Sequence, residues 1–147
     1  MKWITREKIR IDRVSSAWLI RSFVDPEAEF LFAPRAEVMS RASAENATPF
    51  HVPEAELGQH DGKTAFDAIL AKYNLTEPAL LLLANMVRAA DQKLAEPPEG
   101  AGIAAMSHGF AYMDLPDEQI LALQAPMWEA LYHFCQSKAA QRSKSEK

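Results

Sequence analysis

The chain has 147 residues, of which 48% are hydrophobic and 24% are charged, and its formal net charge is −4. This length and composition fit one globular domain with a single sizeable core. The N-terminus is charged, and the longest apolar run, residues 79–84, is far too short to cross a bilayer. These features exclude a secretory signal and a membrane span, and we expect a cytoplasmic protein.

Charge is unevenly distributed along the chain. The last ten residues hold four basic side chains and one acidic side chain, a net +3, so the preceding residues carry −7. We expect a folded domain over residues 1–137 and a basic, disordered tail over residues 138–147. The acidic body is not expected to bind nucleic acid directly. The single cysteine, Cys135, excludes an internal disulfide and multi-cysteine metal sites, and we expect it in the core.

Three short runs rich in aromatic and β-branched residues predict strands in the first third of the chain. They cover residues 2–5, 28–32 and 50–52. In the third run His51 alternates with Phe50 and Val52, so we expect its side chain to face solvent.

A helix is predicted between the first two strands, from Asp12 to about Val24. Asp12 is a favourable N-cap residue. Asp25 and Pro26 end the helix, because the residue before a proline avoids the helical region.

Further helices are predicted from periodicity and from the positions of threonine and proline. They cover residues 36–45, 64–73, 76–93, 103–113 and the segment that begins at Pro116. Two apolar stripes are expected to face the core: Ile103, Met106, Phe110 and Met113, and then Ile120, Leu123, Met127, Leu131 and Phe134. We predict an α+β fold, a helix-dominated single domain with a small β-sheet formed mainly by the N-terminal third.

Charged residues lie inside the apolar run Ile11–Val24. As a helix, this run places Arg21 on the same face as Trp18 with apolar residues on nearly every side, so burial is expected. An unpaired buried charge costs several kcal/mol by rough estimate, so Arg21 needs a carboxylate or an incoming anion as its partner. The candidate carboxylates are Asp12, Asp67 and Asp91.

A polar cluster at residues 56–62 has the residue types of a metal site. Imidazole and carboxylate groups bind first-row transition ions and leave room for water or an oxyanion. The predicted ligands of one divalent metal ion, of unspecified identity, are Glu56, His60 and Asp67. The alternative is structural, with a turn at Asp61 and Gly62 and solvated side chains around it.

Arg88 and Asp91 are three residues apart, close enough to pair on one helix face. The run before Arg88 is apolar, and this allows a second arrangement. In it, Arg88 turns inward toward Asp12, Arg21 or Asp67 and gives a buried charged network. The predicted network residues are Asp12 and Asp91.

Several motifs occur together in the order of one known family. They are Lys2-Trp3-Ile4-Thr5-Arg6, Ile11-Asp12-Arg13, Trp18-Leu19-Ile20-Arg21, Phe23-Val24-Asp25-Pro26, Glu29-Phe30, Glu56-Leu57-Gly58, His60, Phe66-Asp67 and Arg88-Ala89-Ala90-Asp91. Over residues 2–135 the chain resembles the chromate-resistance protein family, the domain that forms the C-terminal part of ChrB.

The resemblance implies a role in chromate resistance beside an efflux transporter. ChrB is regarded as a chromate-responsive regulator with an additional N-terminal domain, so this chain is expected to be a free-standing accessory or sensor module. Many members carry cysteines where Ser16 and Thr64 stand here. Reduction of chromate by thiols at these positions is therefore not expected.

Chromate and sulfate are tetrahedral dianions, which arginine side chains bind by charged hydrogen bonds. The predicted anion-binding residues are Arg13, Arg21 and Arg88. The neighbouring carboxylates would repel an anion unless a metal or an arginine neutralised them, so we expect a mixed arginine, carboxylate and histidine pocket.

Three functions stay open at this point. The first is a sensor or accessory module that binds a small oxyanion or another small molecule, with a homodimer as an expected assembly. The second is a metalloenzyme of unknown substrate that uses an ion held near His60. The third is a buried structural network on a protein whose functional surface faces a protein partner.

Overall fold

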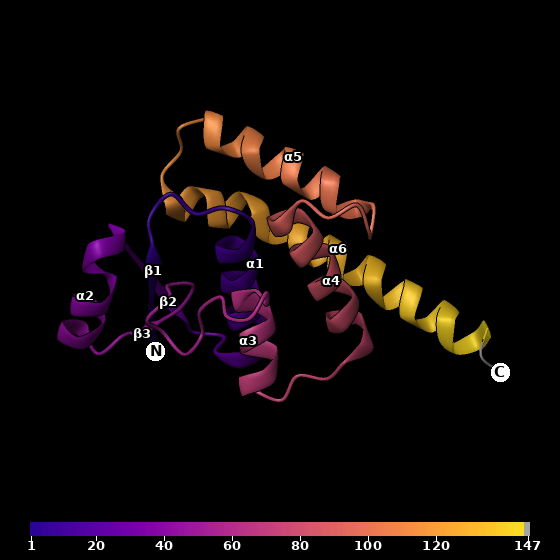
Figure 1. Cartoon of the computed structure of the whole chain (residues 1–147), viewed down its shortest axis with the longest axis horizontal. Helices are drawn as coiled ribbons and strands as arrows, with labels where there is room; N and C mark the ends of the chain where they lie inside the picture. Colours follow the sequence, from indigo (N-terminus) through magenta and orange to yellow (C-terminus); the bar gives the residue numbers. More distant parts are fainter. Residues whose placement is uncertain (146–147) are drawn as a thin grey trace.

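The computed structural model describes residues 1–145 of the chain (Figure 1). The elements are, in order, β1 (Lys2–Arg6), α1 (Ile11–Leu19), a π-helical turn η1 (Ile20–Val24), β2 (Glu29–Ala33), a 3-10 turn η2 (Arg35–Glu37), α2 (Val38–Glu45), β3 (Thr48–Pro49), α3 (Ala65–Lys72), α4 (Pro78–Gln92), α5 (Glu99–Tyr112) and α6 (Asp117–Ser145). The fold class is α+β as predicted, with helices after a small N-terminal sheet. Among the described residues no helix is both long and apolar enough to cross a membrane.

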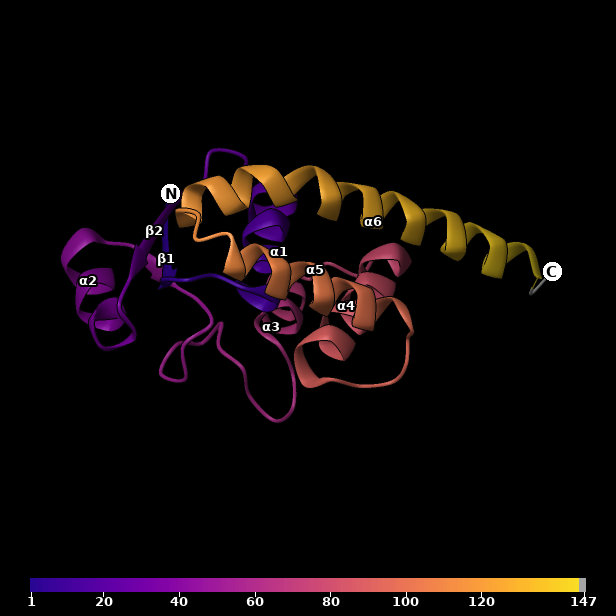
Figure 2. The same ribbon diagram turned by 90° about the horizontal axis from the view of Figure 1, so that it is seen from above.

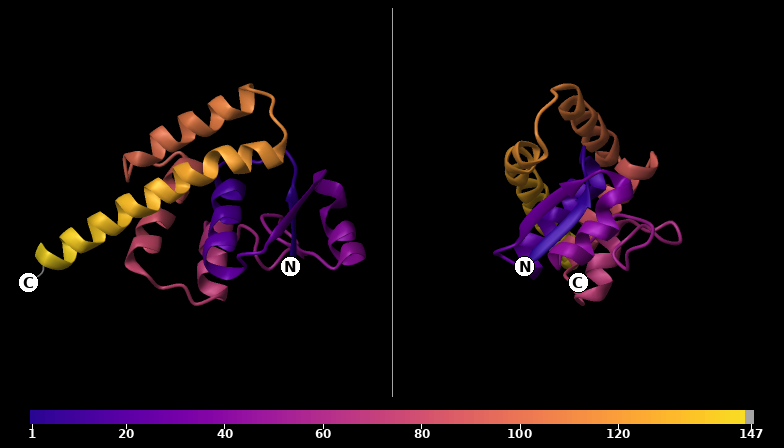
Figure 3. Two further views of the ribbon diagram at one scale, coloured as in Figure 1. Left: turned by 180° about the vertical axis from the view of Figure 1, so that it is seen from behind. Right: turned by 90° about the vertical axis from the view of Figure 1, so that its left-hand side faces the viewer.

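The sheet has the order β2-β1-β3, and β1 pairs in parallel with both neighbours. Lys2 lies opposite Glu29 and Arg6 opposite Ala33, while Trp3 pairs with Thr48 on the other edge. Parallel sheets are normally covered on both faces. Here α2 lies on one side of the sheet and the helical body on the other (Figure 3).

Two cores follow from the alternation of side chains along β1. Trp3 is fully buried in the main core, which joins the sheet to α1, α3, α4 and parts of α5 and α6. Its neighbour Ile4 points to the opposite face and is buried with Val38 and Ala42 of α2 in a smaller core. The sheet therefore connects the two cores.

All nine residues of α1 are buried, because the helix packs against α3, α4 and α6. The predicted end of this helical segment is confirmed: η1 ends at Val24, directly before Asp25 and Pro26. The predicted N-cap is wrong, because the helix begins at Ile11 and Arg10 holds the cap position without a side-chain hydrogen bond. The Asp12 carboxylate is directed to another helix instead.

The predicted third strand is displaced by two residues. Pairing with β1 occurs at Thr48 and Pro49, and the chain then turns at His51, whose φ is 57°. A positive φ interrupts the extended alternation on which the solvent-facing prediction for His51 rests. The His51 side chain instead lies mostly buried, with 14% of it exposed.

The C-terminal helix departs from the sequence predictions in two ways. First, α6 continues to Ser145, so residues 138–145 are helical where a disordered tail is predicted. Ala139, Ala140, Gln141 and Arg142 are strong helix formers, which accounts for the extension. Residues 146 and 147, also in the predicted tail, lie outside the described part.

Second, the buried face of α6 agrees with the predicted stripe at Ile120 but departs from it further along the helix. Ile120, Gln124, Trp128 and Cys135 are its buried residues, whereas Leu123 and Phe134 are exposed. The buried positions follow each other at intervals of four and seven residues, as expected for one face of a helix. Leu131 of the predicted stripe packs against the core while partly buried, and Leu123 and Phe134 lie along an adjacent, exposed face.

Candidate functional site

Asp12 links two helices through its buried carboxylate. Its Oδ2 accepts a hydrogen bond from the backbone N–H of Ala65 at 2.7 Å, and its Oδ1 accepts one from Phe66 at 3.0 Å. These N–H groups belong to the first turn of α3, where no intrahelical acceptor exists. Asp12 therefore caps α3 from α1, and its charge is favourable at this positive helix end.

The pKa of Asp12 reflects two opposing effects. Burial raises it, but the interaction with His51 and the hydrogen bonds from Ala65 and Phe66 lower it by more. The net pKa lies below its usual value, so the carboxylate is ionised at neutral pH.

Gln59 bridges two carboxylates. Its Nε2 donates to Asp12 Oδ2 at 3.0 Å and to Asp91 Oδ2 at 2.9 Å. Burial raises the pKa of Asp91, and the nearby charge of Asp12 raises it further. The amide donor thus holds together two acids that would otherwise repel each other.

His51 contacts both Asp12 and Arg13. Its Nε2 is 3.2 Å from Asp12 Oδ2, and its Nδ1 is 3.4 Å from Arg13 Nη1. A guanidinium can only donate, so Nδ1 accepts and Nε2 is left to donate to the carboxylate. Both ring nitrogens are engaged, which makes His51 a connecting residue.

Arg13 is buried and forms none of the ion pairs found within residues 1–145. Its Nη2 donates to the Lys8 carbonyl at 2.9 Å, and its Nε has no partner among the described residues. Burial and the nearby charge of Arg6 lower the pKa of Arg13 to about 10. With 8% of its surface exposed, this side chain is inaccessible to an anion from solvent.

Arg88 pairs with Asp67 rather than with Asp91. Its Nη2 lies 2.8 Å from Asp67 Oδ1 and its Nε 3.3 Å from Oδ2, a two-point contact. Asp67 also accepts from the backbone and the hydroxyl of Thr64, and so completes a capping box at the start of α3. The guanidinium is therefore already neutralised.

The three predicted metal ligands are held by different partners. Glu56 is 73% exposed and pairs with Lys72 at 2.8 Å, which raises the pKa of Lys72. His60 Nε2 lies 3.0 Å from the Ala55 carbonyl, and Asp67 faces Arg88. Within residues 1–145 no group of three or more histidine, cysteine, aspartate or glutamate side chains is arranged to hold a metal ion. The donor set predicted from the sequence does not fit a metal in this geometry.

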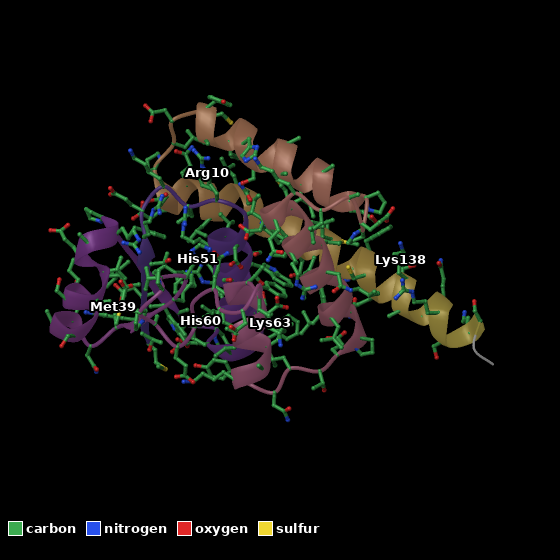
Figure 4. All side chains as sticks on the ribbon, viewed as in Figure 1. Arg10, Met39, His51, His60, Lys63 and Lys138 are labelled. Atoms are coloured by element: carbon green, nitrogen blue, oxygen red, sulfur yellow. The ribbon has the colours of Figure 1, made fainter. Side chains whose placement is uncertain are left out.

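Part of the predicted cluster does share a pocket. His60, Asp67 and Arg88 line a cavity of about 450 Å³ together with Lys63, whereas Glu56 is not part of its lining. His60 and Lys63 lie near the start of α3 (Figure 4). Within this pocket Arg88 and Asp67 are paired with each other at 2.8 Å.

Arg21 lies in a different pocket, of about 310 Å³, between α1, η1, β2 and α6. The polar and aromatic side chains in its lining are Trp18, Arg21, Ser22, Phe30, Trp128 and Glu129. Arg21 Nη2 donates to the Ala28 carbonyl at 3.0 Å, and the guanidinium carbon lies 4.8 Å from the centre of the Phe30 ring. These contacts fix the guanidinium beside an aromatic face.

The predicted burial of Arg21 is wrong. The residue is exposed, and among residues 1–145 it forms no ion pair with a carboxylate. The α1 hydrogen-bond pattern changes to that of a π-helix at Ile20, and the long side chain carries its charge out to solvent. Arg21 still shares a pocket with Trp18, the residue on its predicted face.

Three residues of these sites are absent from the site predicted from the sequence. His51 is predicted to face solvent, and Gln59 is a neutral amide whose residue type carries no charge to indicate a role. Glu129 accepts from Trp18 Nε1 at 3.1 Å across 111 positions of sequence. Only Gln59 had a local signal, its place between Gly58 and His60 in the polar cluster.

The predicted anion-binding arginines thus lie in three places: Arg13 inside the network, Arg88 paired with Asp67, and Arg21 at an open pocket. Known proteins support the relationship seen in the motifs. The family described as "ChrB, C-terminal domain" matches residues 3–135. No solved structure gives a significant match.

A curated relative is Protein ChrB of Cupriavidus metallidurans, which is 31% identical over 121 residues. The match covers 82% of this chain and 36% of the relative, so the chain spans about a third of that protein's length. The family match covers nearly the whole chain and includes both ends of the Ile11–Val24 run. The chain belongs to the family of ChrB C-terminal domains.

Proposed function

We propose that this chain is an accessory or sensor module in chromate and general oxyanion resistance, and that it binds a tetrahedral oxyanion at Arg21. Family membership supports the connection with chromate resistance. The observation that carries the choice of site is the unpaired state of Arg21, among the described residues, in a pocket of about 310 Å³.

The other two arginines are poorer anion ligands. Arg88 would have to release Asp67, its two-point partner at 2.8 Å and 3.3 Å. Arg13 would have to be exposed from a buried position, and its charge is already unfavourable beside Arg6. Both changes cost free energy before any anion is bound, so Arg21 is favoured.

Arg21 is positioned to bind with little rearrangement. One terminal nitrogen donates to Ala28 and the guanidinium packs near Phe30, so the remaining N–H groups are held in a fixed orientation. Ser22 lines the same pocket and offers a hydroxyl donor. An oxyanion here would receive charged hydrogen bonds, which are about twice as strong as neutral ones.

The carboxylate of Glu129 opposes the binding of a negatively charged ligand in this pocket. Its Oε2 accepts from Trp18, and its Oε1 lies 3.3 Å from His133 Nε2. A carboxylate on the pocket wall repels a dianion that is not held close to Arg21. Replacing Glu129 with glutamine should therefore tighten anion binding.

Calorimetric titration with chromate, sulfate and phosphate at constant ionic strength tests this function. Saturable binding is expected for the native chain, with loss of binding in Arg21→Ala and partial retention in Arg21→Lys. Arg35→Ala removes another exposed arginine and is expected to bind as the native chain does. Absence of saturable binding at millimolar ligand, or unchanged binding by Arg21→Ala, contradicts the proposal.

The divalent metal at Glu56, His60 and Asp67 stays a prediction. To form it, Glu56 would have to leave Lys72 and Asp67 would have to leave Arg88. Metal analysis of protein purified without chelator, compared with a His60→Ala variant, tests this site separately from Arg21. The oxyanion proposal does not depend on its result.

A further inference from the structure

Helices α5 and α6 leave a groove between them. Both pack on α4, and the groove has a volume of about 620 Å³. The views in Figures 1 and 2 show the two helices side by side at the edge of the molecule, with the end of α6 projecting beyond the rest. The apolar side chains in its lining are Ile103, Met106, Met127, Ala130, Leu131 and Phe134.

An apolar stripe runs along α6, and its last three residues line this groove. Leu123, Met127, Ala130 and Phe134 follow each other at intervals of four, three and four residues. Leu123 is 43% and Phe134 45% exposed, although both are large and apolar. Intervals of this kind are typical of a seam that packs against another helix.

One side of α5, continued by its C-cap residue Met113, has the same spacing, and Gly102 and Met106 of this side line the groove. Gly102, Met106, Gly109 and Met113 are separated by four, three and four residues, and Met113 is 57% exposed. A Cβ atom added at Gly102 or Gly109 would meet no atom within 4 Å. The two glycines therefore leave open space where a foreign side chain can insert.

Charge along α6 is arranged in opposite blocks. Asp114 and Glu118, at or just before its N-terminal end, are exposed and acidic. Arg142 and Lys144 lie in its last turn and are basic, and Lys138, which pairs with Glu99 of α5 at 3.6 Å, lies about one turn earlier. The apolar stripe lies between the two blocks.

We propose that the α5–α6 face is the interface of a homodimer in which the α6 helices of two copies pack antiparallel. A two-fold axis near Met127 and Ala130 places the acidic end of each α6 beside the basic end of its partner. The same axis packs the two stripes together and brings four helices into one bundle.

Self-association is favoured over an unrelated partner because the surface is complementary to itself. An antiparallel two-fold arrangement brings together groups at equal distances on either side of the axis, and the acidic and basic blocks lie at similar distances from Met127 and Ala130. The helix of 29 residues is roughly 43 Å long, enough for an extended contact.

The test compares the association of the full chain and its variants by analytical ultracentrifugation over a range of concentrations. The native chain is expected to dimerise, and Phe134→Glu to weaken the dimer by more than about tenfold. Leu81→Glu is the matched control, because Leu81 is 48% exposed on α4, away from this face. Circular dichroism of each variant reports whether it is folded.

Charge reversal tests the antiparallel arrangement. Glu118→Lys or Arg142→Glu alone should weaken the dimer, and the double variant should restore it, because each end then again meets its opposite. A chain that is monomeric up to millimolar concentration overturns the proposal, as does a folded Phe134→Glu that dimerises normally. Failure of the double variant to recover overturns the antiparallel packing.

Discussion

The charged residues at the two ends of the run from Ile11 to Val24 differ in burial and in their partners. At the first end Asp12 and Arg13 are buried, and the Asp12 carboxylate interacts with groups from α3, the loop before it and its own helix. At the other end Arg21 is exposed at a pocket and holds one carbonyl and one aromatic ring. The same segment thus contributes a structural cluster at one end and an available cation at the other.

The difference shows that the burial of a charged side chain, rather than its presence in the sequence, indicates whether it has a structural role or can bind a ligand. A buried carboxylate must have its hydrogen-bonding needs met within the fold, so it leaves nothing for a ligand. An exposed guanidinium with free N–H donors is solvated by water, so leaving it without a carboxylate partner costs little free energy. Variants at the two ends of the run should therefore separate effects on stability from effects on ligand binding.

The largest effect on stability is expected from Asp12→Ala. It removes the acceptor of two α3 N–H groups and the partner of His51, and should lower the free energy of unfolding by about 3–5 kcal/mol. Urea unfolding followed by circular dichroism measures this loss. Asp12→Asn retains one acceptor oxygen and should lose less; a loss below about 1 kcal/mol for the alanine variant contradicts the assigned role.

The same carboxylate predicts a pH dependence. Its pKa is lowered in the folded state from the ordinary value of 3.8. The stabilisation is therefore fully present above that value and is lost as the pH falls through the folded pKa. The stability difference between the native chain and Asp12→Asn should shrink in acid, and a difference that is constant from pH 7 to pH 3 contradicts this account.

Gln59→Ala should have an intermediate effect. Removing the amide leaves Asp12 and Asp91 without their shared donor, and a loss of about 1–3 kcal/mol is expected. Thermal unfolding measures it, and Asp91→Asn in the same chain should recover part of the loss because it removes the repulsion between the acids. Independent, additive effects of the two substitutions would argue against the bridge.

Asp91→Asn alone should stabilise the protein slightly. The pKa of Asp91 is raised from 3.8, so its ionisation costs stability above the folded pKa and costs nothing below the ordinary value. Because the group is partly exposed, the gain at neutral pH should be less than about 1 kcal/mol. Denaturant curves at pH 7 and pH 3.5 should show it only at the higher pH, with Glu54→Gln, an exposed carboxylate, as control.

The smallest effect on stability is expected from Arg21→Ala, within about 0.5 kcal/mol of the native chain. Its effect on oxyanion binding should nevertheless be the largest. Thermal unfolding and calorimetry on one preparation measure both. A large loss of stability in Arg21→Ala would place this arginine with Asp12 as a structural residue.

Features determined by neighbours in sequence could be predicted. Asp25 and Pro26 mark the end of the first helical segment, and Thr64 caps α3, as the local pattern indicates. The small sheet and the helices after it follow from short-range propensity and periodicity in the same way. These features need no information about distant contacts.

Features that depend on distant contacts could not be predicted from the sequence. Aspartate is a favoured N-cap residue, so the sequence predicts that Asp12 caps its own helix. Its carboxylate instead accepts hydrogen bonds from backbone N–H groups 53 and 54 positions away. The face that α6 buries depends on where α4 and α1 pack, and both faces of the helix carry apolar residues. The change to a π-helical turn at Ile20 leaves no signal in the residue types, so the exposure of Arg21 could not be anticipated.

The reactivity of Cys135 can report the separation of α6 from α4. It is fully buried, its Sγ lies 3.9 Å from Met86 Sδ of α4, and burial raises the pKa of its thiol to about 11. A thiol-specific reagent can modify it only after α6 has separated from α4, since the thiolate is scarce in the closed state. As the sequence contains no second cysteine, the labelling rate reports this separation without any engineered label.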